Sequence, residues 1–400
     1  MNTAASYSVL EAASVTSRTA APRLILASGF QPDYVREIAN AHARLGSTVH
    51  VVGGDMHEQQ TYHPNVSLLN LRGRDERENS TLREIAKLAG YLSRLVRTVC
   101  TSDAPIVYDV SIGRPLLRCL LMYPLFRLAG KRIVYTAHNV LPHDADTFAN
   151  RMVYWFIYRL LADSIVVHGQ SLKERLITEF NVQPERVHTV AHGTYHPRDT
   201  EAITKATARK QLGIAPRERV LLCFGLQRHY KGTHFVLEAL NDYCAADLVL
   251  VVRGHAPDEA YKEFLTAQVR RHCGGLRINA RLKAVSDAEM EVVFKAADIV
   301  LLPYLEGSQS GIKFMAYAYG RPVLASETGS LREYIQPGIS GETFTMADPV
   351  AFRTALERML AHLADYSDEK ILAYAREHCS FDAAATQVAA LCGRLSKEGG

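Results

Sequence analysis

Short runs of apolar residues alternate along this chain with longer segments whose apolar positions recur every three or four residues. The first pattern is typical of buried strands, and the second of amphipathic helices. Because strands and helices follow one another in turn, we expect parallel sheets that are covered by helices. The sequence therefore predicts the α/β class, with doubly wound sheets that bind their ligands at the carboxyl ends of the strands.

The predicted elements fall into two similar halves, and 400 residues exceed one ordinary domain. In the first half we expect strands at residues 24–27, 49–52, 106–108, 133–136, 164–167 and 187–190. Helices are expected between them at residues 34–45, 82–99, 115–128, 150–161 and 171–179. The second half repeats the pattern, with strands at 220–224, 248–252 and 299–302 and helices at 235–240, 261–272, 287–295 and 311–319. Two domains that face each other across a cleft are predicted.

Polar and small residues mark where these domains begin and end. Residues 1–20 are predicted to form a disordered tail, and residues 21–198 the N-terminal domain. The C-terminal domain is expected over residues 199–378, followed by a terminal segment over 379–400. The polar stretch 198–210 predicts a hinge between the two halves.

Composition narrows the functional classes. Hydrophobic residues make up 48% of the chain and charged residues 22%, which is typical of a well-packed globular protein. The net charge of +4 (46 minus 42) is too small to indicate a nucleic-acid partner. Seven scattered cysteines without a C-x-x-C motif indicate reduced thiols. No signal-peptide core lies in residues 1–19 and no apolar run is long enough to span a bilayer, so a cytoplasmic location is expected.

Two stretches about seventy residues apart carry most of the chemical information, at residues 224–233 and 301–327. Each is predicted as a buried strand, a turn with glycine or serine, and a helix. The first turn places Arg228 and Lys231 just before Gly232, and the second places Ser310 and Gly311 at the start of its helix. A helix N-terminus offers unpaired N–H groups and a positive dipole end, and two nearby cations suit a diphosphate. A nucleotide-diphosphate donor is the leading hypothesis.

These stretches resemble the donor-binding half of GT-B glycosyltransferases, the class that includes glycosyltransferase family 4. The pattern F-G-x-x-R-x-Y-K-G at 224–232 and the pattern H-N-x-x-P-H-[DE] at 138–144 are similar to bacterial exopolysaccharide mannosyltransferases of the xanthan type. Family 4 carries an arginine where Leu226 stands here. It also carries two glutamates where this chain has Gly307 and Met315, while Glu306 lies one place off. The resemblance covers the chain from about residue 22.

The resemblance implies the GT-B fold, with two Rossmann-like domains and a last helix, about 382–395, that crosses back to the N-terminal domain. It implies transfer of a hexose, mannose favoured, from a GDP- or UDP-linked donor without a metal or other cofactor. The acceptor would be a glycan or a polyprenyl-linked saccharide in exopolysaccharide or cell-surface glycan synthesis. The donor-binding candidates are Arg228, Lys231, Gly232, Arg253, Glu306, Ser310, Gly311 and Thr328. Two alternatives stay open: a sugar-nucleotide epimerase of the same fold, and a non-catalytic binding partner of glycosyltransferases.

Catalytic candidates follow the strands of the first half. In family 4 a histidine at the place of His138 approaches the donor sugar, whereas a purely structural role would cap the end of the strand. An inverting transfer needs a base on the acceptor hydroxyl. Asp144 is the first candidate, Asp33 the second and Asp109 the third. Each of these aspartates alone is as well explained by a turn or a helix cap, and retention assisted by the donor phosphate remains the alternative.

Two patterns that suggest metals do not fit their surroundings. Asp144 and Asp146 spell D-x-D, but the GT-A element order that uses this motif is absent. His188, His192 and His196 recur every fourth residue, yet they lie on a predicted strand and turn and not on a helix. We therefore predict no metal site, and we expect His192 to shape the floor of the cleft.

The predicted helix 82–99 carries a stripe of basic residues opposite its apolar side. Arg83, Lys87, Arg94 and Arg97 share this stripe at 100° per residue. The default interpretation is a helix packed on the core with a solvated basic face. The alternative is contact with anionic lipid, where each cation contributes about 1 kcal/mol. In that case the protein is peripheral on the cytoplasmic face of the inner membrane.

Overall fold

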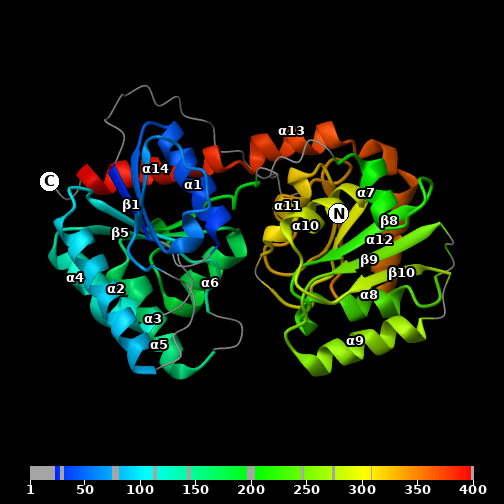
Figure 1. Ribbon diagram of the computed structural model, residues 1–400, viewed down its shortest axis with the longest axis horizontal. Helices are drawn as coiled ribbons and strands as arrows, with labels where there is room; N and C mark the ends of the chain where they lie inside the picture. The colour runs from blue at the N-terminus through cyan, green and yellow to red at the C-terminus, as the bar shows by residue number, and fades with distance from the viewer. Residues whose placement is uncertain are drawn as a thin grey trace, which may run out of the picture.

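The computed structural model describes residues 23–27, 31–73, 81–110, 115–141, 146–195, 203–243, 245, 247–272, 275–307 and 309–397. They form two α/β domains, each with one parallel sheet between layers of helices (Figure 1). This confirms the predicted fold class. The expected tail lies outside the described residues, as does the boundary predicted between residues 198 and 199.

The N-terminal domain has a seven-stranded parallel sheet in the order β3-β2-β1-β4-β5-β6-β7. Its strands are β1 (Arg23–Ala27), β2 (Thr48–Gly53), β3 (Val66–Asn70), β4 (Ile106–Asp109), β5 (Arg132–Thr136), β6 (Ser164–Val167) and β7 (Val187–Thr189). Its helices are α1 (Pro32–Arg44), η1 (Asp55–His57), α2 (Thr81–Thr101), α3 (Pro115–Leu117), η2 (Arg118–Met122), α4 (Tyr123–Leu128), α5 (Phe148–Phe156), η3 (Ile157–Leu161), α6 (Gln170–Phe180) and η4 (Pro184–Arg186). The strand order reverses between β1 and β4, which is where a doubly wound sheet opens a binding crevice.

The C-terminal domain has a six-stranded parallel sheet in the order β10-β9-β8-β11-β12-β13. Its strands are β8 (Arg219–Phe224), β9 (Leu248–Arg253), β10 (Arg277–Arg281), β11 (Ile299–Leu302), β12 (Val323–Ser326) and β13 (Gly341–Phe344). The helices after residue 203 are α7 (Lys205–Gln211), η5 (His229–Lys231), α8 (Thr233–Ala239), α9 (Glu259–Arg271), α10 (Asp287–Ala296), α11 (Gly311–Ala318), α12 (Pro349–Ala361), η6 (Leu363–Asp365), α13 (Asp368–His378) and α14 (Phe381–Lys397). Here the order reverses between β8 and β11, so the two sequence stretches flank the switch point.

Four strands are not predicted from the sequence, namely β3, β10, β12 and β13. Three of them are edge strands, of which β3 and β10 bury few side chains and so show weak apolar alternation. The third, β13, is mostly buried, but its sequence Gly-Glu-Thr-Phe contains no apolar run. β12 is only four residues long and directly follows a helix and its turn. Two predicted helices, at 115–128 and 150–161, are interrupted by the π-helical turns η2 and η3, which contact each other. Helices α12 and α13 are also not predicted.

The last helix, α14, lies over the N-terminal domain, although it follows the C-terminal one (Figure 1). Phe381, Ala385 and Val388 are buried in the same core cluster as Leu24 of β1. On the surface, Arg44 of α1 forms an ion pair with Asp382 at 2.6 Å. The chain therefore passes between the domains twice, once before α7 and once before α14.

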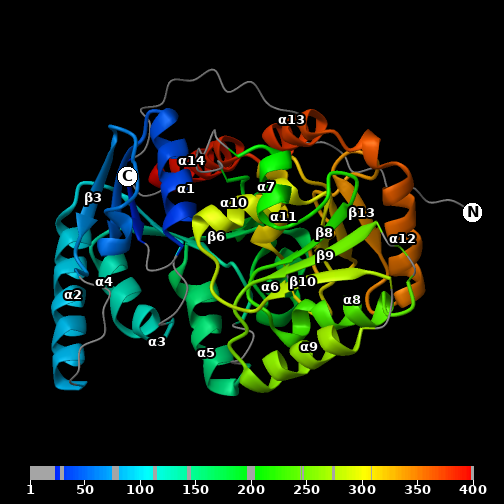
Figure 2. The same ribbon diagram turned by 45° about the vertical axis from the view of Figure 1, so that its right-hand side comes forward.

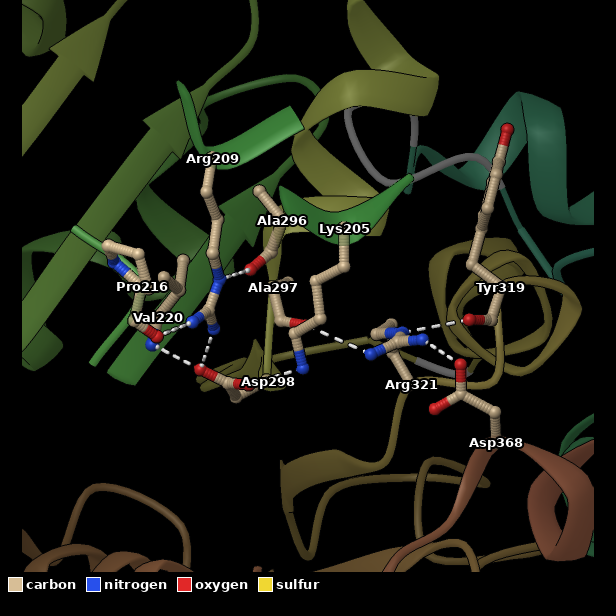
Figure 3. A network of polar contacts seen from close by, with 10 residues as sticks. All are labelled: Lys205, Arg209, Pro216, Val220, Ala296, Ala297, Asp298, Tyr319, Arg321 and Asp368. Atoms are coloured by element: carbon tan, nitrogen blue, oxygen red, sulfur yellow. Dashed lines mark hydrogen bonds and ion pairs between the residues drawn. The ribbon is translucent and has the colours of Figure 1, made fainter. Parts of the chain in front are cut away.

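The predicted hinge at 198–210 is too long, because its second half forms α7. Thr204 caps this helix by accepting a hydrogen bond from the Thr207 N–H at 3.1 Å. Arg209 is buried, and its guanidinium donates to the Asp298 carboxylate at 2.6 Å (Figure 3). Lys205 reaches the other carboxylate oxygen at 2.6 Å. A polar helix can thus belong to the C-terminal domain, since a buried carboxylate satisfies its cations.

Asp298 also accepts a hydrogen bond from the Val220 N–H at 2.7 Å, so it joins α7 to the start of β8 (Figure 3). We expect Asp298→Ala to lower the free energy of unfolding by about 3–5 kcal/mol, because it leaves Arg209 buried without its charge partner. Denaturant unfolding followed by circular dichroism measures this change.

The matched control removes an exposed carboxylate from an ion pair in the same domain. Asp247 pairs with Arg219 at 2.9 Å, and half of the Asp247 side chain is exposed. Asp247→Ala should therefore cost less than about 1 kcal/mol. Equal losses in the two variants would contradict the central role of Asp298.

Candidate functional site

The two sequence stretches meet at the carboxyl edge of the C-terminal sheet. β8 and β11 are neighbours in the sheet, and each runs into a loop and then a helix. The loops touch directly, because the Leu305 N–H donates to the Tyr230 carbonyl at 2.7 Å. The start of α11 also lies close to the first turn, since a Cβ on Gly225 would stand 3.5 Å from Ile312.

Two glycines allow this close packing of backbone. Gly232 has φ +70°, and a Cβ there would lie 1.9 Å from the Pro303 carbonyl oxygen. Gly254 has φ +141°, and a Cβ there would lie 1.8 Å from the Gly225 carbonyl oxygen. A side chain at either position would force the loops after β8, β9 and β11 apart. The glycine of the predicted turn therefore shapes the site through its backbone.

A chain of hydrogen bonds links the lysine of the first turn to the helix start of the second. The Lys231 ammonium donates to the Tyr304 hydroxyl at 3.0 Å and lies 4.8 Å from the centre of that ring. The Tyr304 and Ser310 hydroxyls are 2.8 Å apart, and Ser310 caps α11 by accepting from the Ile312 N–H. Burial disfavours the charged lysine, but Tyr304 outweighs it and raises the pKa of Lys231. A held cation thus stands beside the N-terminus of α11.

The other donor-binding candidates lie in different surroundings. Arg228 is half-buried just before η5, and its positive charge acts to lower the pKa of Lys231. Arg253 is buried, where its guanidinium donates to Asn279 at 2.6 and 2.8 Å and pairs with Glu289 at 3.2 Å. Glu306 is exposed in the loop after β11, and Thr328 is half-buried in the turn after β12. The structure brings Lys231, Gly232, Ser310 and Gly311 together. The guanidinium of Arg253 is instead bound by Asn279 and Glu289.

Three histidines follow three consecutive strands of the N-terminal sheet. His138 follows β5, His168 follows β6 and His192 lies just beyond β7, and all three are buried. The ring centres of His138 and His168 are 5.3 Å apart, and those of His168 and His192 are 5.0 Å apart. Tyr34 of α1 contacts all three rings. His168 was not predicted, although its position after Ile-Val-Val is the same strand-end signal that singled out His138.

Burial keeps these histidines neutral. It lowers the pKa of His138 to about 4 and that of His192 to about 3. The pKa of His168 also lies well below its usual value, and burial is the largest cause of this shift. Each ring has a nitrogen near a backbone carbonyl, which can only accept, so that nitrogen carries the proton. His138 donates through Nε2 to Val110, and His192 donates through Nδ1 to Gly193. The remaining nitrogen of each ring is a hydrogen-bond acceptor.

The histidine cluster lies against the donor-side helix of the other domain. His192 stacks on Phe314 of α11, with ring centres 5.2 Å apart and planes inclined by 8°. A Cβ on Gly311 would lie 3.9 Å from His192 Nε2, so this acceptor faces the start of α11. His192 therefore lies at the contact between the two domains.

The three candidate bases are placed differently. Asp144 lies outside the described residues. Asp33 stands in the first turn of α1, 43% exposed, and pairs with Arg36 at 3.3 Å. Asp109 ends β4 fully buried, where Arg118 lies at 3.0 Å and the Tyr123 hydroxyl donates at 2.7 Å. Asp109 thus serves a buried ion pair, which makes it a poor base.

The metal patterns gain no support. His188 lies in strand β7, so the helical geometry that would make a four-residue spacing a zinc motif is missing there. His196 and Asp144 lie outside the described residues. Among the residues that the structure describes, no group of three or more histidine, cysteine, aspartate or glutamate side chains could hold a metal ion.

The fold places two facing α/β domains in contact and sets a cation beside a helix N-terminus at the edge of the C-terminal sheet, an arrangement that favours anions. Two family models match the chain: "Glycosyltransferase Family 4" over residues 32–196 and "Glycosyl transferases group 1" over residues 218–362. Together they cover both domains, and the chain belongs to these glycosyltransferases.

Individual relatives are distant. A D-inositol 3-phosphate glycosyltransferase of Catenulispora acidiphila is 27% identical over 56% of this chain and 55% of its own length. A GDP-mannose:glycolipid 4-beta-D-mannosyltransferase of Xanthomonas campestris is 27% identical over 53% of this chain and 56% of its own. The match thus spans about half the length of these curated relatives.

Solved structures share the whole fold. HepE of Anabaena in complex with UDP and glucose aligns over 93% of this chain and 100% of its own, with a TM-score of 0.71 and 16% identity. Sucrose-phosphate synthase of Thermosynechococcus elongatus aligns over 94% of this chain and 100% of its own, with a TM-score of 0.71 and 17% identity. At this identity the likeness establishes the GT-B fold alone.

The buried histidines predict how stability depends on pH. Their folded-state pKa values lie below that of an unfolded histidine, so their contribution is complete above about pH 6.5 and is lost as the pH falls toward 4. We expect His138→Asn to reduce the loss of unfolding free energy between pH 7 and pH 5 by roughly 2 kcal/mol relative to the parent. Chemical denaturation at both pH values measures this, and parallel losses in parent and variant would contradict it.

Proposed function

We propose that this chain transfers a hexose from a nucleotide-diphosphate sugar to a hydroxyl of a glycan or polyprenyl-linked saccharide. The observation that carries the proposal is the connection of Lys231 through Tyr304 to Ser310 at the start of α11. It sets a fixed cation beside a helix N-terminus, next to the neutral histidines of the other domain. This arrangement suits a diphosphate on one side and a sugar on the other.

The residues would stabilise the charge that develops during transfer. The acceptor hydroxyl attacks the anomeric carbon and the bond from that carbon to the diphosphate oxygen breaks, so negative charge grows on the leaving diphosphate. Lys231, Arg228 and the first turn of α11 favour this charge. A metal is not needed for this role, because protein cations supply it.

His138 is proposed to position the sugar. Its Nε2 donates to Val110, so Nδ1 is left as an acceptor for a sugar hydroxyl. A ring that stays neutral over the physiological pH range acts here through hydrogen bonding and not through proton transfer. Asp33 and Asp144 remain the proposed bases of an inverting reaction: Asp33 lies in the first turn of α1 after β1, and Asp144 follows β5 in the sequence.

GDP-mannose is the proposed donor. The mannosyltransferase of Xanthomonas that resembles this chain is named for GDP-mannose. The motifs at 138–144 and 224–232 also resemble exopolysaccharide mannosyltransferases of the xanthan type. HepE of Anabaena was solved with UDP and glucose, so UDP-linked donors form the comparison set. In either case the proposed pathway is exopolysaccharide or cell-surface glycan synthesis at the cytoplasmic side of the membrane.

A panel of GDP-, UDP- and ADP-sugars tests the proposal by isothermal titration calorimetry with a chelator present. We expect one nucleotide class to bind, and Lys231→Ala to lower the turnover with that donor more than about a hundredfold, because one charge-assisted contact to the leaving group is lost. Lys262→Ala is the matched control, since Lys262 pairs with Glu259 on the surface of α9.

The same assays separate the alternatives. An epimerase converts the donor sugar when no acceptor is present. A non-catalytic partner binds the donor but forms no product, whether or not an acceptor is present. Near-normal turnover of Lys231→Ala would remove the proposed site, whatever the reaction.

Contact with a membrane surface is proposed for the N-terminal domain. Large apolar side chains are exposed on its helices α2, α3 and α5, which lie together in both views (Figures 1 and 2), and on the π-helical turns η2 and η3 that follow α3 and α5. We call them the apolar face: Leu82, Ile85, Leu116, Leu120, Phe148, Met152, Phe156 and Leu160. Among them, Ile85 of α2 is 59% exposed. No helix in the described ranges is long and apolar enough to cross a bilayer.

The basic stripe of α2 lies near this apolar face. Arg83 and Arg97 are exposed and Lys87 is half-buried, while Arg94 donates to the Leu71 carbonyl at 2.9 and 3.1 Å. Apolar side chains beside cations are the combination that binds the interface of an anionic bilayer. A lipid-linked acceptor would then meet the cleft from the membrane side.

We expect the protein to float with vesicles that contain anionic lipid at low salt. Phe148→Ser combined with Leu120→Ser should reduce the bound fraction roughly tenfold, because two apolar side chains leave the bilayer interface. Val350→Ser is the matched control, since Val350 is exposed on α12 of the other domain. Equal flotation of both variants, or no binding of the parent, would contradict the proposed membrane contact.

A further inference from the structure

A glutamate of the C-terminal domain caps a helix of the N-terminal domain. Both carboxylate oxygens of Glu333 accept from the Gln170 N–H at 2.9 Å, and one lies 3.4 Å from the Ser171 nitrogen. Beside it, the Ser171 and Ser330 hydroxyls are 2.8 Å apart. α6 has no side-chain cap of its own, because its N-cap residue is Gly169. The negative charge therefore meets the positive end of a helix across the domain boundary.

The approach of the two segments requires Gly169. A Cβ at this position would lie 2.1 Å from Ser330 Oγ and 3.2 Å from a carboxylate oxygen of Glu333. The backbone before α6 is thus shaped to receive the turn that carries Glu333. A contact made by two exposed side chains would not need a glycine of this kind.

The turn that carries Glu333 is attached to the donor-side helix. Lys313 of α11 is fully buried, and its ammonium donates to the carbonyls of Leu331 at 3.0 Å and Glu333 at 2.5 Å. Tyr317 of the same helix donates to the Tyr334 carbonyl at 2.7 Å. Tyr334 itself has φ +58°, a conformation that such contacts stabilise. A shift of α11 must therefore move Glu333 with it.

On the other side, the capped segment is continuous with the histidine cluster. Gly169 and Gln170 directly follow His168. The path from the start of α11 to His168 thus runs through Lys313, Glu333 and the first N–H of α6. The stack of His192 on Phe314 is a second link between α11 and the histidine cluster. These two links set how the donor turn stands relative to the histidines.

We infer that Glu333 is a positioning residue for the transfer reaction: its carboxylate on α6 fixes the donor-site helix against the acceptor-side cleft. This role rests on the proposed function. Opening of the domains would move the carboxylate into water and leave α6 uncapped. The cap therefore favours the closed arrangement, in which the anomeric carbon and the acceptor hydroxyl are aligned.

Glu333→Gln keeps the shape of the side chain and removes its charge. We expect kcat/KM to fall about tenfold, which corresponds to the loss of one charge–dipole contact, while the Kd of the donor changes less than twofold. Glu174→Gln is the matched control, because the Glu174 carboxylate lies on the surface of α6 and accepts from the Gln170 side chain of its own helix. A decrease of less than twofold for Glu333→Gln would overturn the role.

A second substitution tests whether the effect passes through the cap. Gln170→Pro removes the N–H that Glu333 accepts from, at a helix position where proline is favoured and after an extended residue. If the cap is the route, Gln170→Pro lowers kcat/KM in the parent but changes it less than twofold in Glu333→Gln. If the double variant instead loses kcat/KM by the product of the two single losses, the substitutions act independently and the mechanism is contradicted. Thermal melts by circular dichroism verify that each variant folds.

Small-angle X-ray scattering supplies a readout that needs no catalysis. We expect Glu333→Gln to increase the radius of gyration relative to the parent and to Glu174→Gln, because the domains separate more often. If this increase appears and no donor is turned over by the parent, the proposed function fails while the cap remains. If the parent transfers sugar and neither kcat/KM nor the radius changes in Glu333→Gln, the positioning role fails.

Discussion

Both parallel sheets turn the carboxyl ends of their strands toward the space between the domains, and the chemistry of the molecule depends on this arrangement. A parallel sheet gathers all of its strand ends at one edge, so loops distant in sequence meet there. The N-terminal edge presents His168 and His192, and the C-terminal edge presents Phe314 and Glu333. The 5.2 Å stack and the 2.9 Å cap show that the two edges touch.

The two edges differ in charge, and this difference assigns their roles. On the C-terminal side, Lys231 keeps its positive charge because the Tyr304 hydroxyl compensates for burial. On the N-terminal side, burial holds the histidines neutral, so they contribute hydrogen-bond acceptors. An anionic leaving group would therefore be drawn to one domain, while the sugar and acceptor meet uncharged groups on the other.

Parts of the molecule that seem peripheral determine how the edges meet. Asp298 ties α7 to the C-terminal sheet, so this helix moves with that domain. The two chain crossings are bonded to each other, because the Thr194 N–H donates to the Cys379 carbonyl at 2.6 Å. Gly193 has φ +91°, and the Phe381 ring of α14 fills the space beside it. The segments that lead into and out of the C-terminal domain are thus joined at Thr194 and Cys379.

The alternation of apolar runs with amphipathic segments determined the α/β class and the central strands, because a strand buried on both faces must be apolar throughout. It could not reveal β3 and β10, whose positions at sheet edges leave them largely exposed or half-exposed, nor β13, whose residues Gly341, Glu342 and Thr343 form no apolar run. The turn around Lys231 and the helix start at Ser310 were visible in the sequence, since glycine, serine and lysine at a strand end have few other uses. That Arg253 and Asp109 are held by buried partners was not visible, because those partners come from other strands and helices.

The sequence by itself therefore determined the fold class, the place of the proposed diphosphate site and two of the three clustered histidines, His138 and His192. Local residue order is enough for these features, because each depends on a strand and the turn that follows it. Only the tertiary structure decided that Tyr304 joins Lys231 to Ser310, that His168 completes the cluster and that Glu333 caps α6. The first two need one folded sheet, because Lys231 meets Tyr304 within the C-terminal domain and the histidines gather within the N-terminal one. The third exists only when the two domains are docked.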